Sequence, residues 1–125
     1  MPLRTKRWND PQEPADGYRL LICRYRPRGL SKQDETWDAW EPALAPSKEL
    51  LADYHGKVRL LTSWTEYRQR YLREMMSQKP LVEALAKRAA GGETITLLCS
   101  SSCDRESRCH RSLLRELIER AMANL

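Results

Sequence analysis

The sequence predicts an α/β fold, namely a small three-layer sandwich with a short, mostly parallel sheet flanked by helices. Two short apolar runs, near residues 18–24 and 94–99, have the length and composition of buried strands. Between them apolar residues recur at helical spacing, and helices between buried strands are typical of parallel sheets. The length of 125 residues is that of one domain, which we expect to span residues 1–125.

The chain opens with residues 1–16, which we expect to be a basic, Pro-containing, irregular N-terminal arm. Pro2, Pro11 and Pro14 stand there among charged residues, and proline removes hydrogen bonds from helices and sheets. We expect Trp8 to attach this arm to the rest of the domain.

Three extended segments are expected after this arm. The first, over residues 18–24, is too short for a helix and is closed by Pro27 and Gly29. A weaker one is expected near residues 37–40. The last, over residues 94–99, is rich in β-branched and apolar residues, as buried strands are.

Four helices are expected, over residues 47–55, 63–77, 80–90 and 108–122. Ser47 and Ser63 are suited to the N-cap position, and Glu66 completes a capping box with Ser63. Pro80 suits the first turn of the third helix, and Gly56 is a natural C-cap of the first.

The composition favours a soluble protein of the cytoplasm. Charged residues make up 31% of the chain, no run of apolar residues is long enough to cross a membrane, and the N-terminus lacks the apolar stretch of a signal peptide. We therefore expect no membrane partner. In that compartment the four cysteines are expected as reduced thiols. Nothing in the sequence assigns a cofactor or an oligomeric state.

The positive charge is concentrated near the N-terminus. Residues 1–33 hold eight Lys or Arg residues against three acidic ones, whereas residues 34–125 hold fourteen of each sign. A basic segment can bind nucleic acid, but no Gly/Arg or aromatic repeat accompanies this one. Solubility charge, with some arginines serving a local site, is the alternative.

Chemistry-bearing residues are concentrated between the last strand and the last helix. Cys99, Cys103, Cys109 and His110 place three thiols and one imidazole within thirteen residues. Such groups are good zinc ligands, but the segment lacks a pair of thiols two residues apart. Side chains of consecutive residues also point in different directions from a helix, which separates Cys109 from His110. We therefore assign no metal ligand from the sequence.

Two other functions suit the same segment. A thiol near a helix N-terminus and beside arginines is stabilised as the reactive thiolate, which makes Cys99 and Cys109, with His110, candidate catalytic residues. The Cys99 to Arg105 spacing also matches the Cys-x5-Arg pattern of cysteine-dependent phosphatases and arsenate reductases.

The third possibility is an anion pocket without covalent chemistry. Loops that follow parallel strands meet at the carboxyl edge of a sheet, so loops 24–29 and 99–111 are expected to converge there. The candidate ligand-binding residues are Arg24, Arg26, Arg28, Ser100 and Arg111.

A purely structural role is the alternative for each residue of the segment between the last strand and the last helix. Cys99 would then be a small buried side chain at a strand end, Ser107 the N-cap of the last helix, and His110 a local hydrogen-bonding group.

Several segments of the chain carry a family resemblance. They include Leu20-Leu21-Ile22-Cys23-Arg24-Tyr25-Arg26-Pro27-Arg28-Gly29, Ala45-Pro46-Ser47, Trp64 to Tyr71 and Cys109-His110-Arg111. From about Tyr18 onward the chain resembles the bacterial domain of unknown function 488 family, also called YeaO-like. The resemblance implies a small α/β domain with its motif residues in strand-end loops. Family members commonly have an acidic residue where Cys23 stands and a tryptophan where Arg26 stands.

We therefore expect an enzyme or binder that acts on an anionic, phosphate-bearing small molecule at a pocket formed by loops 24–29 and 99–111. The alternative is a nucleic-acid-binding or regulatory module that uses the basic N-terminal region.

Overall fold

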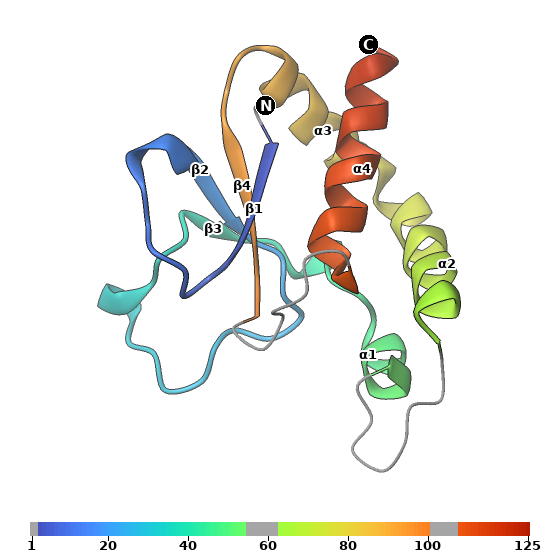
Figure 1. Ribbon diagram of the computed structural model, residues 1–125, viewed down its shortest axis with the longest axis horizontal. Helices are drawn as coiled ribbons and strands as arrows, with labels where there is room; N and C mark the ends of the chain where they lie inside the picture. Colours follow the sequence, from blue (N-terminus) through green and yellow to red (C-terminus); the bar gives the residue numbers. More distant parts are fainter. Residues whose placement is uncertain (1–2, 55–62, 101–107) are drawn as a thin grey trace.

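The computed structural model describes residues 3–54, 63–100 and 108–125 and contains a four-stranded sheet (Figure 1). The strands have the order β1-β4-β2-β3, and every neighbouring pair is parallel. Their bounds are β1 Leu3–Arg7, β2 Tyr18–Leu21, β3 Ala39–Trp40 and β4 Ile95–Cys99. The predicted α/β fold with a short parallel sheet is confirmed, and the last three strands lie where the sequence predicts them.

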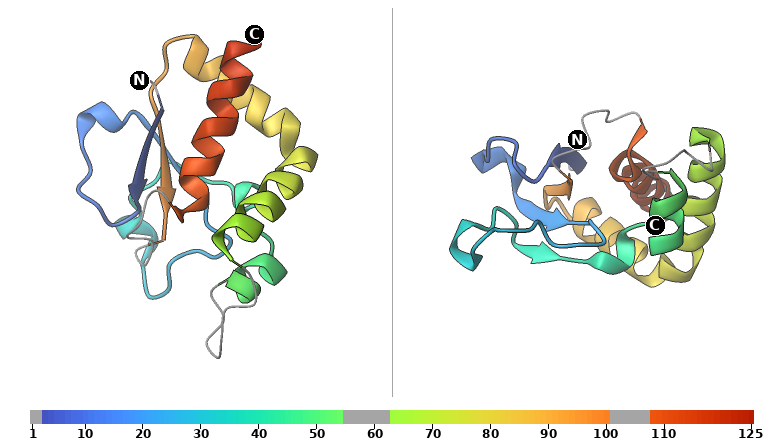
Figure 2. Two further views of the ribbon diagram at one scale, coloured as in Figure 1. Left: turned by 45° about the vertical axis from the view of Figure 1, so that its right-hand side comes forward. Right: turned by 90° about the horizontal axis from the view of Figure 1, so that it is seen from below.

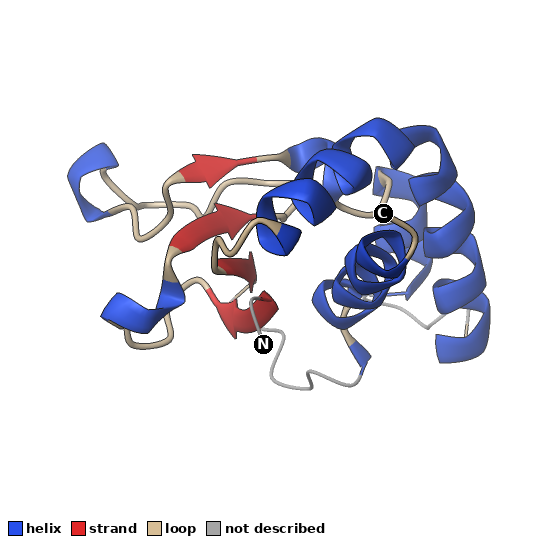
Figure 3. Cartoon of the chain, turned by 90° about the horizontal axis from the view of Figure 1, so that it is seen from above, coloured by secondary structure: helices blue, strands red, loops and turns tan. Residues whose placement is uncertain are grey.

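The α-helices lie together on one side of this sheet (Figure 2). Their bounds are α1 Lys48–Tyr54, α2 Trp64–Met75, α3 Lys79–Ala90 and α4 His110–Ala123. The opposite face is covered by loops and by two 3-10 turns, η1 Pro14–Asp16 and η2 Lys32–Asp34 (Figure 3). The layer beyond the sheet is therefore built from loops and short turns, whereas all four α-helices form the other layer.

Local signals place the helices correctly. The Ser47 hydroxyl accepts a hydrogen bond from the Leu50 amide at 3.2 Å, and the Ser63 hydroxyl accepts one from the Glu66 amide at 3.2 Å. Both serines thus satisfy amides that the helix itself leaves open. The predicted cap Gly56 lies outside the described residues. Two further 3-10 turns, η3 Pro42–Leu44 and η4 Met76–Gln78, precede α1 and α3.

Residues 3–7 correct the expected irregular arm, because they form the edge strand β1. Each of them pairs with a residue of β4, from Leu3 opposite Ile95 to Arg7 opposite Cys99. Leu3 is the single aliphatic residue of this strand, so its own sequence carries no strand signal. Pairing with β4 stabilises this strand instead, together with the ion pairs of Arg4 and Lys6 on the face opposite the helices. As expected, Trp8 packs against the domain, and its amide bonds the Cys99 carbonyl at 2.8 Å.

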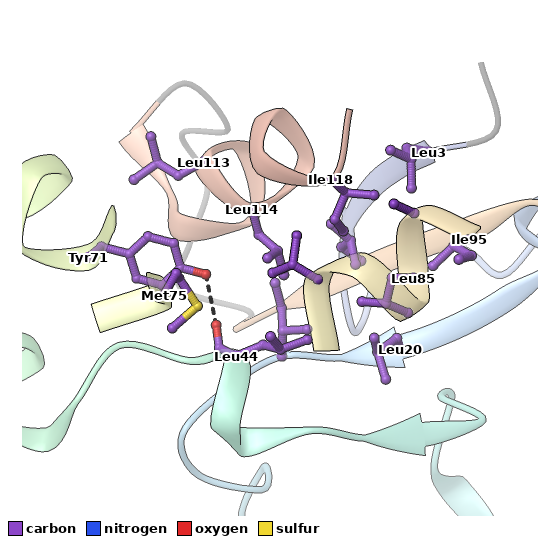
Figure 4. Close-up of a cluster of buried hydrophobic side chains, with 14 of the residues drawn as sticks. Leu3, Leu20, Leu44, Tyr71, Met75, Leu85, Ile95, Leu113, Leu114 and Ile118 are labelled. Carbon is purple, nitrogen blue, oxygen red and sulfur yellow. Dashed lines mark hydrogen bonds between the residues drawn. The ribbon is translucent and has the colours of Figure 1, made fainter. Parts of the chain in front are cut away.

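The main core lies between the sheet and the helices (Figure 4). Leu114 and Ile118 of α4 and Ile95 of β4 are fully buried. Tyr71 of α2 is also fully buried, and its hydroxyl donates to the Leu44 carbonyl at 2.8 Å. Because an unpaired phenol would be costly there, this bond anchors η3 against α2.

The opposite face of the sheet holds a buried ion cluster. Asp16 is fully buried and forms ion pairs with Arg19, Lys6 at 2.8 Å and Arg4 at 3.2 Å. The Thr96 hydroxyl of β4 donates to the Asp16 carbonyl at 2.7 Å. Three cations of the basic N-terminal quarter therefore surround one carboxylate. They are part of the fold and not a free basic patch.

Within the described residues, every helix is too short or too polar to cross a membrane.

Candidate functional site

A cavity of about 570 Å³ lies at the carboxyl edge of the sheet. Trp8 follows β1, Cys23 and Arg24 follow β2, and Cys99 ends β4, so all three strands deliver residues to its wall. The N-terminus of α4 contributes Cys109. This is the edge where parallel sheets place their ligands, and the cavity is bounded by both loops that the sequence analysis expects to converge.

Two thiols and an imidazole meet in the wall of this cavity. The Sγ atoms of Cys99 and Cys109 are 3.0 Å apart, and His110 Nδ1 lies 3.8 Å from the first and 3.9 Å from the second. The three residues are 1%, 2% and 6% exposed. Cys103 lies outside the described residues.

The backbone at the start of α4 produces this convergence. Cys109 is the N-cap residue and has an extended conformation, with φ −126° and ψ 146°, while His110 is the first helical residue. The two side chains therefore do not follow the angular step of consecutive helical positions. The expectation that the donor atoms of Cys109 and His110 diverge is wrong, because Cys109 lies at the N-cap and not inside the helix. The alternative cap, Ser107, lies outside the described residues.

A backbone carbonyl fixes the orientation of the His110 ring. The Nε2 atom lies 2.8 Å from the Ile22 carbonyl oxygen, so Nε2 carries the hydrogen and donates it. In the neutral imidazole Nδ1 then keeps its lone pair, on the side of the two sulfur atoms. The Tyr71 ring packs against His110 with 5.7 Å between centroids. Burial raises the pKa of Tyr71 well above its ordinary value, and charge on Cys109 and Cys99 adds to this effect.

Two of the candidate arginines are held by the protein. The Arg24 guanidinium donates to the carbonyls of Pro46 at 3.0 Å and Ala45 at 3.2 Å. Arg26 forms an ion pair with Glu35 at 2.7 Å and lies over the Trp37 ring. Both arginines line the cavity, but their polar groups shape the loop.

Two other arginines of the cavity wall are not engaged in this way. Arg28 and Arg108 are exposed and line the cavity, and neither makes a hydrogen bond or an ion pair with the described residues. Arg28 is a ligand-binding candidate from the sequence, whereas Arg108 is expected there only as one of the arginines that favour the thiolate of Cys109. The sequence signal that could have identified Arg108 as a site residue is its position next to Cys109.

The remaining candidates differ in position. Ser100 lines the cavity directly after β4. Arg111 is 5% exposed and is not among the described residues that line the cavity. Burial opposes ionisation of Asp10, but hydrogen bonds from Arg7 and the charges of Arg7 and Arg111 hold the pKa of Asp10 below its ordinary value. The charge of Arg111 thus acts on Asp10, which follows β1 and does not line the cavity.

Apolar side chains complete the wall and were also missed by the sequence analysis as site residues. They are Trp8, Pro46, Leu51 and Tyr67. Helical spacing marks Leu51 and Tyr67 as core residues, and Trp8 stands in the segment expected to be irregular, so these three carry no local signal for a cavity. Pro46 stands in the family motif Ala45-Pro46-Ser47.

Comparison with known proteins agrees with the motifs. The chain is 37% identical over 101 residues to the uncharacterized protein YeaO of Escherichia coli (strain K12), with 81% of this chain and 84% of that protein covered. It is 28% identical over 116 residues to the uncharacterized protein Rv3073c of Mycobacterium tuberculosis (strain H37Rv), with 93% and 92% covered. No solved structure matches the chain. The model of the DUF488-N3a family, described as the active DUF488-N3 subclade, matches residues 3–122, so the chain belongs to the DUF488 family.

Proposed function

We propose that the protein binds an anionic, phosphate-bearing small molecule in the cavity at the carboxyl edge of the sheet. The observation that carries this proposal is the state of Arg28 and Arg108, which line the cavity and have no partner among the described residues. Arginine presents paired N–H groups that match phosphate oxygens. Two such groups on one cavity wall suit a ligand phosphate.

The rest of the wall suits an apolar or aromatic part of the same ligand. Trp8, Leu51 and Tyr67 line the cavity, and Tyr25 is 60% exposed beside the arginines of the loop. A flat ring can stack on such aromatic side chains. A nucleoside monophosphate combines a ring with a phosphate and has the size of a ligand for a cavity of about 570 Å³.

The buried cluster of Cys99, Cys109 and His110 lies in the same wall, which supports a reaction on the ligand as well as binding. The description of the matching family as active agrees with this interpretation. We therefore retain these three residues as candidate catalytic residues, with Arg24, Arg26 and Ser100 shaping the wall near them.

The proposal is tested by binding measurements with adenosine monophosphate and with inorganic phosphate. Losing a hydrogen bond to a charged group costs about 1.5–3 kcal/mol, which is roughly a 10- to 150-fold weaker Kd. We expect that loss for Arg28→Ala and for Arg108→Ala. Arg120→Ala is the matched control, because Arg120 is exposed on α4 and does not line the cavity. Absence of binding at millimolar ligand, or equal losses in all three variants, would refute the proposal.

Nucleic-acid binding is the rival function, and the pairing of charges does not favour it. Arg4, Lys6 and Arg19 surround Asp16, and Arg7 pairs with Asp10 at 2.9 Å. A salt titration with an oligonucleotide distinguishes the two functions, because contacts with several phosphates give a steep, log-linear fall of affinity with salt. A steep slope, together with unchanged oligonucleotide binding in Arg28→Ala, would favour the rival.

A further inference from the structure

We propose that Cys99, Cys109 and His110 form a zinc site whose fourth coordination position opens into the cavity. Metal binding by these residues stands independently of the proposed function. The role of the metal toward an anionic ligand rests on that function.

The distances between the three donor atoms fit one ion. The two sulfur atoms and Nδ1 form a triangle with sides of 3.0, 3.8 and 3.9 Å. The point equidistant from its corners lies about 2.1 Å from each, compared with zinc bonds of ~2.0–2.1 Å to nitrogen and ~2.3 Å to sulfur. An ion with these bond lengths would lie less than about 1 Å above the plane of the triangle. The two sulfur atoms, at 3.0 Å, are closer than the ~3.8 Å of a regular tetrahedron with such bonds, so metal binding would move them apart by about 0.8 Å.

The hydrogen bond of the imidazole is a second, independent observation. His110 donates from Nε2 to the Ile22 carbonyl, and zinc-binding histidines characteristically donate their other N–H to a carbonyl or carboxylate. This bond places the hydrogen on Nε2, so the Nδ1 lone pair lies on the side of the sulfur atoms. Because Ile22 is fully buried, the ring is held in this orientation without rearrangement when a metal binds.

The charge of the site also favours a divalent ion. Two thiolates with their sulfur atoms 3.0 Å apart would repel strongly in a buried place. No carboxylate is found among the described residues that line the cavity. Zn²⁺ with two thiolates and a neutral imidazole has no net charge, so the complex avoids the cost of burying an unpaired charge. Thiolate and imidazole are ligands that zinc prefers over the hard cations Mg²⁺ and Ca²⁺.

Three protein ligands with an open position are the pattern of catalytic zinc, whereas structural zinc is closed by four. All three residues line the cavity, so the fourth position is available to water or to an oxygen of a bound anion. Zinc there would polarise that oxygen as a Lewis acid. Arg28 and Arg108 would hold the remaining charge of the ligand in the same cavity.

The first test uses the unmodified chain. Protein stripped of metal with a chelator is titrated with Co²⁺, which reports thiolate bonds through charge-transfer absorption in the near ultraviolet. We expect this absorption to saturate at one Co²⁺ per chain and to disappear when one equivalent of Zn²⁺ is added. If no saturable thiolate band appears, the proposal is overturned. This test requires no variant.

Variants then identify the ligands. Cys109→Ala and His110→Ala should each weaken Zn²⁺ binding by more than the ~10- to 100-fold that is typical of losing a residue that hydrogen-bonds a metal ligand. Cys23→Ala is the matched control, because Cys23 is a buried thiol that lines the same cavity but lies outside the triangle. It should bind one equivalent with unchanged affinity, as should Cys103→Ala. Equal losses in Cys23→Ala, or loss of zinc in Cys103→Ala, would overturn the assignment of three ligands and an open position. Circular dichroism shows whether each variant is folded.

The zinc site and the proposed function are tested by separate measurements. Arg28→Ala should retain the Co²⁺ band while losing affinity for adenosine monophosphate. A normal Co²⁺ titration without nucleotide binding would leave the zinc site standing and refute the proposed function. Nucleotide binding without any thiolate band would refute the zinc site and leave the proposed function standing.

Discussion

The most consequential single change on the face of the sheet opposite the helices is Asp16→Asn. This substitution keeps the shape of the side chain but removes the negative charge of a fully buried residue. Asp16 faces Arg19, Lys6 and Arg4, whose side chains are 1%, 12% and 33% exposed. These four residues come from β1, η1 and β2, so the cluster joins the N-terminal segment to the sheet.

The cost of the substitution depends on which cations lose their partner. Lys6 and Arg4 can still pair with Glu13, which lies at 2.6 and 3.7 Å from them. The Arg19 guanidinium forms no other ion pair among the described residues. Its Nε donates to the Thr36 carbonyl, and the backbone amide of Arg19 donates to the Asp38 carboxylate. Removing one partner of a buried ion pair costs about 3–5 kcal/mol. Because only one guanidinium is left uncompensated, we expect the lower end of that range, about 3 kcal/mol.

Urea unfolding followed by tryptophan fluorescence measures this loss. With an m-value of about 1.5 kcal/mol per molar urea, the midpoint should fall by roughly 2 M at pH 7. The matched control is Asp53→Asn, which breaks the half-exposed pair with Arg70 at 2.7 Å and should cost no more than ~1 kcal/mol.

The pH dependence gives the sign of the effect. Burial alone would raise the pKa of Asp16, but hydrogen bonds from Lys6 and the Glu13 amide, with the charges of Lys6 and Arg19, hold it below its ordinary value. A lowered native pKa stabilises the fold above the unfolded-state pKa of about 3.9, and this stabilisation is lost as the pH falls through the native value. The difference between Asp16→Asn and the unmodified protein should therefore shrink below about pH 4. A penalty similar to that of Asp53→Asn, or one independent of pH, would refute the reasoning.

Two further substitutions test the fold. Gly17→Ala should be strongly destabilising, by several kcal/mol, because Gly17 has φ +63° and an added Cβ would lie 2.4 Å from the Thr94 carbonyl oxygen. Thermal unfolding measures it, and a melting temperature unchanged from that of Gly92→Ala, where no atom lies within 4 Å of the added Cβ, would contradict it. Tyr71→Phe removes the bond to the Leu44 carbonyl and should cost about 1–3 kcal/mol in urea unfolding. The contrary result is a stability equal to that of the unmodified chain.

Local sequence signals were sufficient for most elements of the fold. Ser47 and Ser63 cap helices because a hydroxyl satisfies amides only three residues away. The apolar run of β4 is fully buried, as its composition predicts. In these segments the interactions that decide the structure are encoded within a few residues, so the sequence alone is informative.

Strand β1 could not be predicted in the same way. Its sequence, LRTKR, contains one aliphatic residue and four polar ones, and its stability comes from pairing with β4, about ninety residues further along the chain. The charges of Arg4 and Lys6 are compensated by Asp16, which belongs to a turn expected to be irregular. Long-range pairing of this kind leaves no periodic pattern in the strand itself.

The sequence by itself determined that thiols, an imidazole and arginines gather around two strand-end loops, because parallel strands bring their carboxyl ends to one edge. Only the tertiary structure decided which of those residues contact one another, which are held by other parts of the protein, and which remain in the cavity wall. The extended backbone of Cys109 brings its sulfur to Cys99 and His110, Glu35 engages Arg26, and Arg28 and Arg108 remain in the cavity wall. The physical reason is that donor convergence and charge pairing depend on distances of a few ångströms between segments far apart in the chain, and spacing in sequence does not encode those distances.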